Sequence, residues 1–213
     1  MSHFDVIVLG SGPGGYVTAI RASQLGFKTA IVEKENLGGV CLNWGCIPTK
    51  ALIKSAQVFE YLQHAEDYGL KASGVDKDFD AVVKRSRNVA GTMSKGVQFL
   101  LKKNKIEVIN GHGKVLPGKK IAVTDANGKA VEYTANNIII ATGARSRELP
   151  SLPQDGKKII GYRQAMTLDK QPEKLIVVGS GAIGIEFAYF YNAMGTDVTV
   201  VEYLPNIVPV EDK

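Results

Sequence analysis

The sequence is poor in the residues that build disulfide frameworks and zinc sites: its 213 residues include two cysteines, three histidines and one tryptophan. Two cysteines and three scattered histidines do not supply the four clustered ligands of a structural zinc site, so we expect no metal. No run of 18 or more apolar residues occurs, which argues against a transmembrane helix. A strand-like segment at residues 4–9 leaves no room for a signal peptide, and we expect a cytoplasmic protein that does not bind membranes.

Charge is spread evenly along the chain. Lys and Arg number 26 against 21 Asp and Glu, a net charge of +5, and no basic run is interleaved with aromatic residues. The sequence therefore gives no indication of nucleic-acid binding. With 45% hydrophobic residues the chain can bury a core, and its length predicts one domain and part of another at roughly 150 residues per domain.

One pattern occurs twice, because the segment that begins at Asp5 aligns without a gap with the segment that begins at Lys174. Each copy has a continuous apolar run typical of a buried parallel strand, then G-x-G-x-x-G, a helix-forming stretch, and a β-branched run that ends in glutamate. The acid follows the last glycine at the same spacing in both copies. The copies comprise Gly10, Gly12, Gly15 and Glu33, and Gly179, Gly181, Gly184 and Glu202.

This spacing is typical of dinucleotide binding. The first glycine permits the tight turn that leaves the strand, the second lets the backbone approach a pyrophosphate, and the third lets the helix pack closely on the sheet. The acid then accepts hydrogen bonds from the hydroxyls of an adenosine ribose. At Glu202 a carboxylate would repel a 2′-phosphate, so the second copy predicts NAD rather than NADP.

Both cysteines lie between the two copies, in residues 37–50. Four residues separate Cys41 from Cys46, a spacing compatible with a disulfide in a distorted helical turn, although two incidental thiols would fit the same spacing. Pro48 suits the first turn of a following helix, whose N-terminal partial charges would stabilise a thiolate at Cys46. In a reducing compartment a purely structural disulfide is not expected, so a bonded pair would serve chemistry.

The segment Gly-Gly-x-Cys-x-Asn-x-Gly-Cys-x-Pro-x-Lys, placed after a dinucleotide turn, resembles the class I pyridine nucleotide-disulfide oxidoreductases. The resemblance covers the whole chain and includes Ala141-Thr142-Gly143. Residues 46–52 and Glu202 most resemble the branch of this family that oxidises dihydrolipoamide. Position 40 is Val where the family frequently has Thr.

The resemblance implies a fold and a division into domains. Residues 1–149 would form a Rossmann-like FAD-binding domain with an antiparallel β-meander insertion, and residues 150–213 the first part of a Rossmann-like NAD-binding domain. The short stretch after Glu202, residues 203–213, cannot complete a nucleotide-binding half. We therefore expect the chain to be an N-terminal fragment. The resemblance implies that the parent is a homodimeric enzyme that acts on lipoyl domains within a 2-oxoacid dehydrogenase or glycine cleavage complex, and that the fragment alone has little lipoamide turnover.

The resemblance also implies roles for individual residues. Cys46 would lie against the flavin and form a charge-transfer complex, and Cys41 would exchange with the substrate. Lys50 would approach the flavin, paired with Glu186. The FAD site would comprise Gly10, Gly12, Gly15, Glu33, Lys50, Gly113, Thr142 and Gly143, and the NAD site Gly179, Gly181, Gly184 and Glu202.

Two alternatives remain open at this stage. The first is another disulfide reductase, of the glutathione or mercuric type, which a preference for NADPH would favour. The second is a non-catalytic flavin-binding or interaction module, which the incomplete second domain favours and the cysteine pair opposes.

The remaining sequence predicts supporting structure. Residues 79–103 form an amphipathic helix in this interpretation, with Val82, Val89, Met93, Val97 and Leu100 on its core face. Residues 120–124 and 131–134 predict a hairpin around Asn127-Gly128, and residues 138–141 a separate buried strand. The proline-containing stretch 148–172 is the expected crossing between domains, and His112 is expected to be structural.

Overall fold

The computed structural model describes residues 2–209, which divide into two compact units. The first unit contains the residues up to Cys46 together with Ala90–Ser146, and the second contains Ile47–Val89 together with the residues from Arg147 on. Helices α3 (Cys46–Gln63) and α4 (Phe79–Lys103) run across this division. The boundary predicted from the sequence, between residues 149 and 150, divides the FAD-binding domain from the NAD-binding domain. It stays a prediction, because the two units above are defined by their packing and not by the cofactor they bind.

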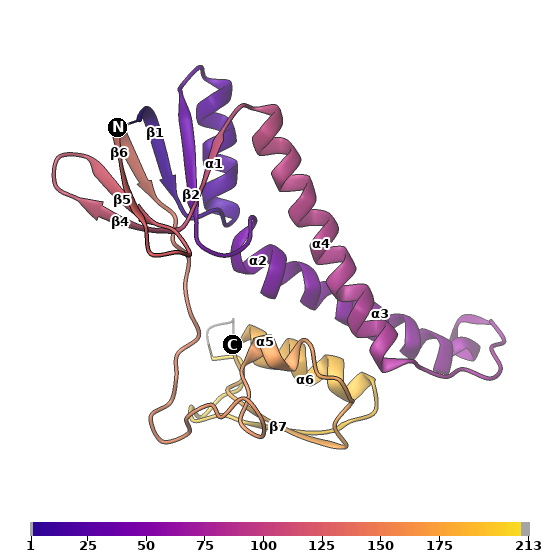
Figure 1. The fold of residues 1–213 in the computed structure, drawn as a ribbon. Helices are drawn as coiled ribbons and strands as arrows, with labels where there is room; N and C mark the ends of the chain where they lie inside the picture. Colours follow the sequence, from indigo (N-terminus) through magenta and orange to yellow (C-terminus); the bar gives the residue numbers. More distant parts are fainter. Residues whose placement is uncertain (1, 210–213) are drawn as a thin grey trace. The chain divides into compact units, whose positions relative to one another are not determined.

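The first unit is built on a six-stranded mixed sheet with the strand order β3-β2-β1-β6-β5-β4 (Figure 1). Neighbours β3, β2, β1 and β6 pair in parallel, whereas β6, β5 and β4 pair antiparallel. The strands are β1 (His3–Leu9), β2 (Thr29–Glu33), β3 (Glu107–Asn110), β4 (His112–Leu116), β5 (Lys120–Thr124) and β6 (Ala130–Ile140). The α/β class is therefore confirmed.

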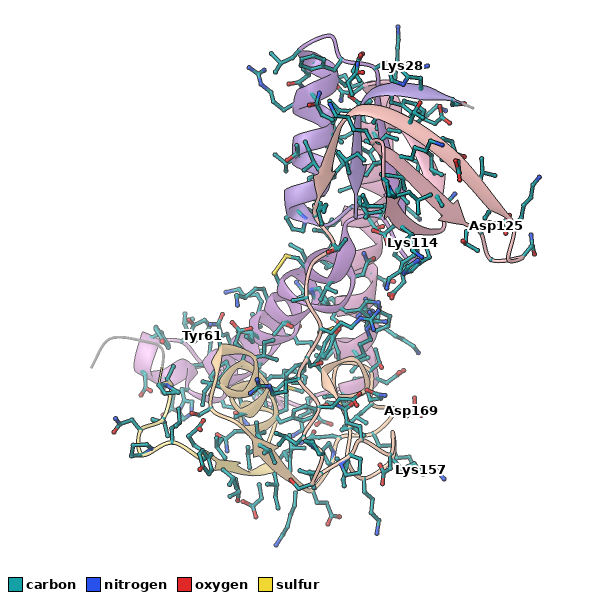
Figure 2. All side chains as sticks on the ribbon, turned by 90° about the vertical axis from the view of Figure 1, so that its left-hand side faces the viewer. Lys28, Tyr61, Lys114, Asp125, Lys157 and Asp169 are labelled. Carbon is teal, nitrogen blue, oxygen red and sulfur yellow. A yellow bond between two sulfur atoms is a disulfide. The ribbon has the colours of Figure 1, made fainter. Side chains whose placement is uncertain are left out.

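The core of this unit surrounds β1. Ile7 and Val8 are fully buried, as expected for a central parallel strand that is covered on both faces. Helix α1 (Pro13–Gln24) packs against β1 and β2. At the edge of the core, Lys28, labelled in Figure 2, places its Nζ 5.0 Å from the ring centroid of Phe4.

Strand β6 differs from the sequence prediction, which had a hairpin strand and a separate buried strand. The structure has one strand of 11 residues that pairs with β5 through its first half and with β1 through its second half. Thr134 belongs to both pairings, opposite Lys120 and opposite His3. Two asparagines interrupt the apolar pattern here, and both donate side-chain hydrogen bonds to Asp5 on β1. The predicted hairpin itself is confirmed.

Helix α4 has the predicted bounds, but its core face was predicted only in part. Val97 is buried, whereas Met93 and Leu100 are 45% and 40% exposed. The other buried positions in the helix are Ser86, Ala90 and Leu101. Two of these residues are small, which lets neighbouring elements approach closely, and a search for large apolar residues misses such positions.

The second unit contains a parallel pair of strands, β7 (Lys174–Val178) and β8 (Asp197–Val201), against which α6 (Ala182–Ala193) packs. The short helices η1 (Ala65–Tyr68) and α5 (Tyr162–Ala165) also belong to it. Its core joins α3 to α6 and comprises Leu52, Ala56, Met166, Phe187, Phe190, Tyr191 and Met194.

Candidate functional site

The first glycine turn connects β1 to α1. Gly10 has φ +100°, and a Cβ there would collide with the carbonyl oxygen of Ala141. A Cβ on Gly15 would collide with the carbonyl oxygen of Gly10. Gly12 has open space and forms the N-cap of α1 without any side-chain cap. Packing therefore explains the outer two glycines, and the middle one leaves the positive end of the helix open to an anion.

The second turn, between β7 and α6, repeats this geometry. Gly179 has φ +101°, close to the value at Gly10, and a Cβ on Gly184 would collide with the carbonyl oxygen of Gly179. Gly181 has open space and is the N-cap of α6, again without a side-chain cap. In each copy the first glycine N–H donates a 2.8 Å hydrogen bond to the strand that carries the acid. The repeat in the sequence is therefore a repeat in structure.

Each acid is held by a serine that sequence reasoning missed. Glu33, at the end of β2, accepts hydrogen bonds at one oxygen from the N–H and the hydroxyl of Ser11, at 3.0 and 2.5 Å. Glu202, directly after β8, accepts the same two bonds from Ser180, at 2.8 and 2.6 Å. The signal that could have found them is positional, because Ser11 and Ser180 occupy the same place in the repeat.

The carboxylate of Glu202 is strongly stabilised in its ionised form. The backbone N–H of Leu204 and the hydroxyl and N–H of Ser180 donate to it and lower its pKa to about 2. The group therefore carries a full negative charge near neutral pH.

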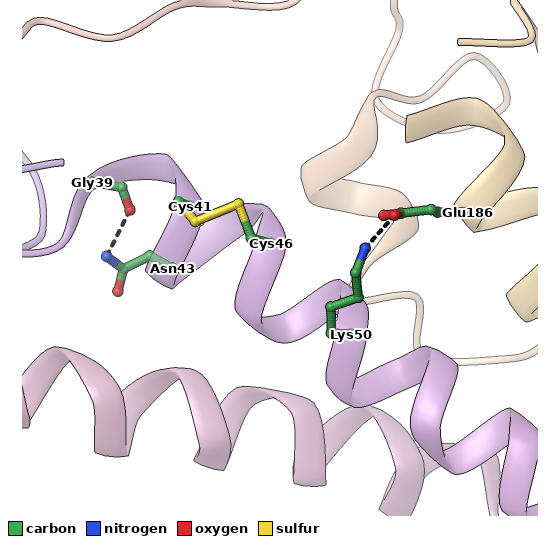
Figure 3. The surroundings of a disulfide bond; sticks show 6 residues. All are labelled: Gly39, Cys41, Asn43, Cys46, Lys50 and Glu186. Carbon is green, nitrogen blue, oxygen red and sulfur yellow. Dashed lines mark hydrogen bonds and ion pairs between the residues drawn. A yellow bond between two sulfur atoms is a disulfide. The ribbon is translucent and has the colours of Figure 1, made fainter. Parts of the chain in front are cut away.

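The two cysteines form a disulfide with a Cα–Cα distance of 4.7 Å (Figure 3). Cys41 lies in a short helix, α2 (Gly39–Trp44), and Cys46 is the first residue of α3. Gly38 and Gly39, both with positive φ, let the chain enter α2 directly. Cys46 is exposed and Cys41 half-buried.

The disulfide-bearing segment is fixed to the first glycine turn. The N–H of Gly38 donates to the carbonyl oxygen of Ser11 at 3.1 Å. A Cβ on Gly39 would lie 2.7 Å from the Cα of Gly12, so only glycine allows this approach. Asn43 is buried and its amide donates to the carbonyl oxygens of Leu37 and Gly39, which closes the turn. Figure 3 shows the bond to Gly39. The structure thus brings the cysteine pair and the first glycine turn together.

Lys50 and Glu186 form an ion pair in the second unit, between α3 and α6 (Figure 3). A second polar contact joins the same helices, because the hydroxyl of Tyr189 donates to the carboxylate of Glu60. Burial, together with this carboxylate, raises the pKa of Tyr189 to about 12.

The other predicted cofactor residues have mixed surroundings. Gly113 lies in β4, and a Cβ there would collide with the side chain of Leu9 and lie 3.2 Å from that of Val32, so a larger residue would have to displace these side chains. Thr142 follows β6 and lies against the Gly10 turn, and Gly143 next to it has φ +72°. His112 is exposed at the start of β4.

Two kinds of feature are absent from residues 2–209. This part of the chain contains no helix long and apolar enough to cross a membrane, and no group of three or more His, Cys, Asp or Glu side chains that could hold a metal ion. The fold and the site define an α/β protein in which two dinucleotide-type turns accompany a cysteine pair.

Comparison with known proteins identifies the family. The chain belongs to the pyridine nucleotide-disulphide oxidoreductases, whose sequence pattern matches residues 4–213. It is 55% identical over 224 residues to dihydrolipoyl dehydrogenase of Rhizobium etli, covering 98% of this chain and 47% of the relative. It is 53% identical over 210 residues to the Zymomonas mobilis dihydrolipoyl dehydrogenase, covering 99% of this chain and 45% of that protein.

Solved structures agree with this assignment. The crystal structure of LpdA from Mycobacterium tuberculosis has a TM-score of 0.87 at 30% identity, covering 97% of this chain and 46% of that one. The HOCl-induced flavoprotein disulfide reductase RclA from Escherichia coli, in its Cu(II) complex, has a TM-score of 0.84 at 26% identity, covering all of this chain and 45% of that one. The chain thus spans slightly less than half the length of the relatives it matches.

Proposed function

We propose that this chain forms the FAD-binding part and the beginning of the NAD-binding part of a dihydrolipoyl dehydrogenase, which oxidises dihydrolipoamide to lipoamide and reduces NAD+. Relatives bearing that name match nearly the whole chain at 41–55% identity. The likeness to this family also supports a homodimer whose partner is a lipoyl domain of a 2-oxoacid dehydrogenase or glycine cleavage complex.

One observation carries the proposal: the disulfide segment is fixed to the glycine turn through Gly38 and Gly39. An incidental pair of thiols needs no such connection. A redox pair that exchanges electrons with a flavin does need it, because the sulfur must be placed relative to the dinucleotide.

The chain's residues fit the two cofactors. The uncapped N-termini of α1 and α6 suit the pyrophosphates of FAD and NAD, and the acids at the ends of β2 and β8 suit the adenosine riboses. We assign Gly10, Gly12, Gly15, Glu33, Lys50, Gly113, Thr142 and Gly143 to FAD, and Gly179, Gly181, Gly184 and Glu202 to NAD.

The chain's own chemistry is thiol–disulfide exchange. A substrate thiolate attacks the sulfur of Cys41, the bond to Cys46 breaks, and Cys46 leaves as a thiolate. The second substrate thiol then displaces Cys41, which leaves the substrate oxidised to its disulfide and both cysteines reduced. Bound FAD supplies the two-electron coupling between this dithiol and NAD+.

The assignment of Cys41 as the exchange sulfur depends on the flavin. Cys46 is the more exposed residue of the pair, so accessibility alone favours attack at Cys46. Flavin placed against Cys46 would cover it and direct substrate to Cys41. The start of α3 at Cys46 stabilises the departing thiolate through the helix N-terminus.

Lys50 and Glu186 complete the proposed catalytic set. The lysine lies one helical turn after Cys46 on α3, and its ion pair with Glu186 holds the ammonium group in place. We propose that this charge acts on the flavin.

An anaerobic absorbance titration tests the proposal. The FAD-loaded full-length protein is reduced with dihydrolipoamide, and we expect a long-wavelength band from the Cys46 thiolate beside oxidised flavin. Cys46→Ser should abolish the band, whereas Cys41→Ser should retain it without added substrate because its Cys46 is already reduced. Flavin binding without a band in the wild type would support a non-catalytic module, and a band obtained with NADPH but not with dihydrolipoamide or NADH would support another disulfide reductase.

A further inference from the structure

The hydroxyl of the serine in the second glycine turn accepts one hydrogen bond and donates another. Ser180 is fully buried, and its hydroxyl oxygen accepts a 2.9 Å hydrogen bond from the backbone N–H of Val208. The hydroxyl proton is then directed to the carboxylate of Glu202, at 2.6 Å. A serine hydroxyl has one proton to donate, so this arrangement commits that proton to Glu202.

The first copy of the repeat differs in the bond made by the backbone that follows the acid. Ser11 donates to Glu33 in the same way, but there the chain returns through a different bond, from the N–H of Gly38 to the carbonyl oxygen of Ser11. Val208 is the counterpart of Gly39 when the two copies are aligned, and both have positive φ, +48° and +61°. In both copies, therefore, the backbone after the acid turns back to the serine. In the second copy the returning backbone bonds to the serine hydroxyl.

We infer that Ser180 is a positioning residue that sets the preference of the second site for a coenzyme with a free 2′-hydroxyl over one with a 2′-phosphate. The inference rests on the proposed binding of NAD at this turn. Ser180 acts through Glu202, because its backbone N–H and its hydroxyl both donate to that carboxylate and hold it against the glycine turn.

Discrimination at this site requires a carboxylate that cannot move away. A held carboxylate accepts a hydrogen bond from a ribose hydroxyl without first being ordered, and it repels a 2′-phosphate at the same position. A carboxylate that is free to change rotamer would lose part of its hydrogen bond to the ribose hydroxyl. It would also swing away from a 2′-phosphate and repel it less. Ser180→Ala removes one donor from Glu202 and leaves the N–H of Val208 without its acceptor, so both the acid and the returning chain become less constrained.

Equilibrium binding provides a test that does not depend on turnover. Isothermal titration of the FAD-loaded full-length protein with ADP-ribose and with 2′-phospho-ADP-ribose gives two dissociation constants and their ratio. We expect Ser180→Ala to weaken ADP-ribose binding about tenfold, because the less constrained Glu202 loses part of its charge-assisted hydrogen bond to the ribose hydroxyl, and to change binding of the 2′-phosphate much less. The ratio therefore falls about tenfold.

The ratio separates positioning from a purely structural role. If the serine only supports the loop, both ligands weaken equally and the ratio stays at its wild-type value, which would overturn the inference. Ser11→Ala is the matched control in the first copy: it should weaken FAD binding and leave the ADP-ribose ratio unchanged, and a change in that ratio would also overturn the inference. A wild-type protein that binds ADP-ribose no better than its 2′-phosphate would instead contradict the proposed NAD site.

Discussion

Substitution of Gly39 by alanine tests the connection between the disulfide segment and the first glycine turn. Two penalties combine at this residue. Its φ of +61° is left-handed, which costs an L-residue with a Cβ about 1–2 kcal/mol. The new Cβ would also lie 2.7 Å from the Cα of Gly12 and 3.0 Å from its nitrogen, and forcing an extra carbon into such packing costs about 1–3 kcal/mol more.

Gly118→Ala is the matched control, because Gly118 has φ +76° and nothing within 4 Å of the position of a Cβ. It should show the backbone penalty alone. We therefore expect Gly39→Ala to lower the free energy of unfolding by about 1–3 kcal/mol more than the control does. Trp44, the single tryptophan, lies in α2 and reports urea unfolding of this region by fluorescence.

The same variants address cofactor binding. Relief of the clash must move either α2 or the backbone of Gly12, the residue whose open space suits a pyrophosphate. We expect FAD affinity to fall for Gly39→Ala, about tenfold for each 1.4 kcal/mol transmitted to that turn, and to stay unchanged for Gly118→Ala. Equal stability and equal FAD affinity in the two variants would refute the reasoning that this close approach joins the two parts of the site.

Two further predictions concern charged groups in the second unit. Because folding lowers the pKa of Glu202 from its ordinary 4.5 to about 2, the stabilisation it provides is complete above about pH 4.5 and is lost as the pH falls towards 2. In urea unfolding followed by circular dichroism, Glu202→Gln should be less stable than the wild type near neutral pH and converge with it near pH 2, and a constant difference across this range would contradict the assignment. Lys50→Met breaks an ion pair whose lysine side chain is 63% exposed, so it should change the free energy of unfolding by less than about 1 kcal/mol. A larger loss would show that this lysine has a structural role as well.

The sequence was sufficient to predict structure where a motif occurs twice or where a helical apolar pattern continues over many residues. The internal repeat places both glycine turns and both acids, and the apolar period places the ends of α4 at Phe79 and Lys103, as observed. Each of these depends on local geometry that the residues themselves impose, such as a turn that only glycine can make.

What the sequence could not supply depends on contacts between distant residues. Strand β6 is continuous because its backbone pairs first with β5 and then with β1, where Asn136 and Asn137 also bond to Asp5, a partner far away along the chain. Gly113 could be assigned to a cofactor from the resemblance, whereas the side chain of Leu9 is what fills its Cβ position. The serine bonds to Glu33 and Glu202 likewise appear only when the strand ends are brought together.

The shared strand β6 affects the order in which the chain can fold. Strand β1 lies far before β6 in the chain, yet one of its two neighbours in the sheet is β6, whose Thr134 pairs with His3. Until the ribosome has passed residue 140, the apolar strand at the centre of the sheet has an unsatisfied edge. Pairing over such a sequence distance is slow, because the loop must close before the contacts form. Strand β1 is therefore a segment for which protection by a chaperone matters while the rest of the sheet is being made.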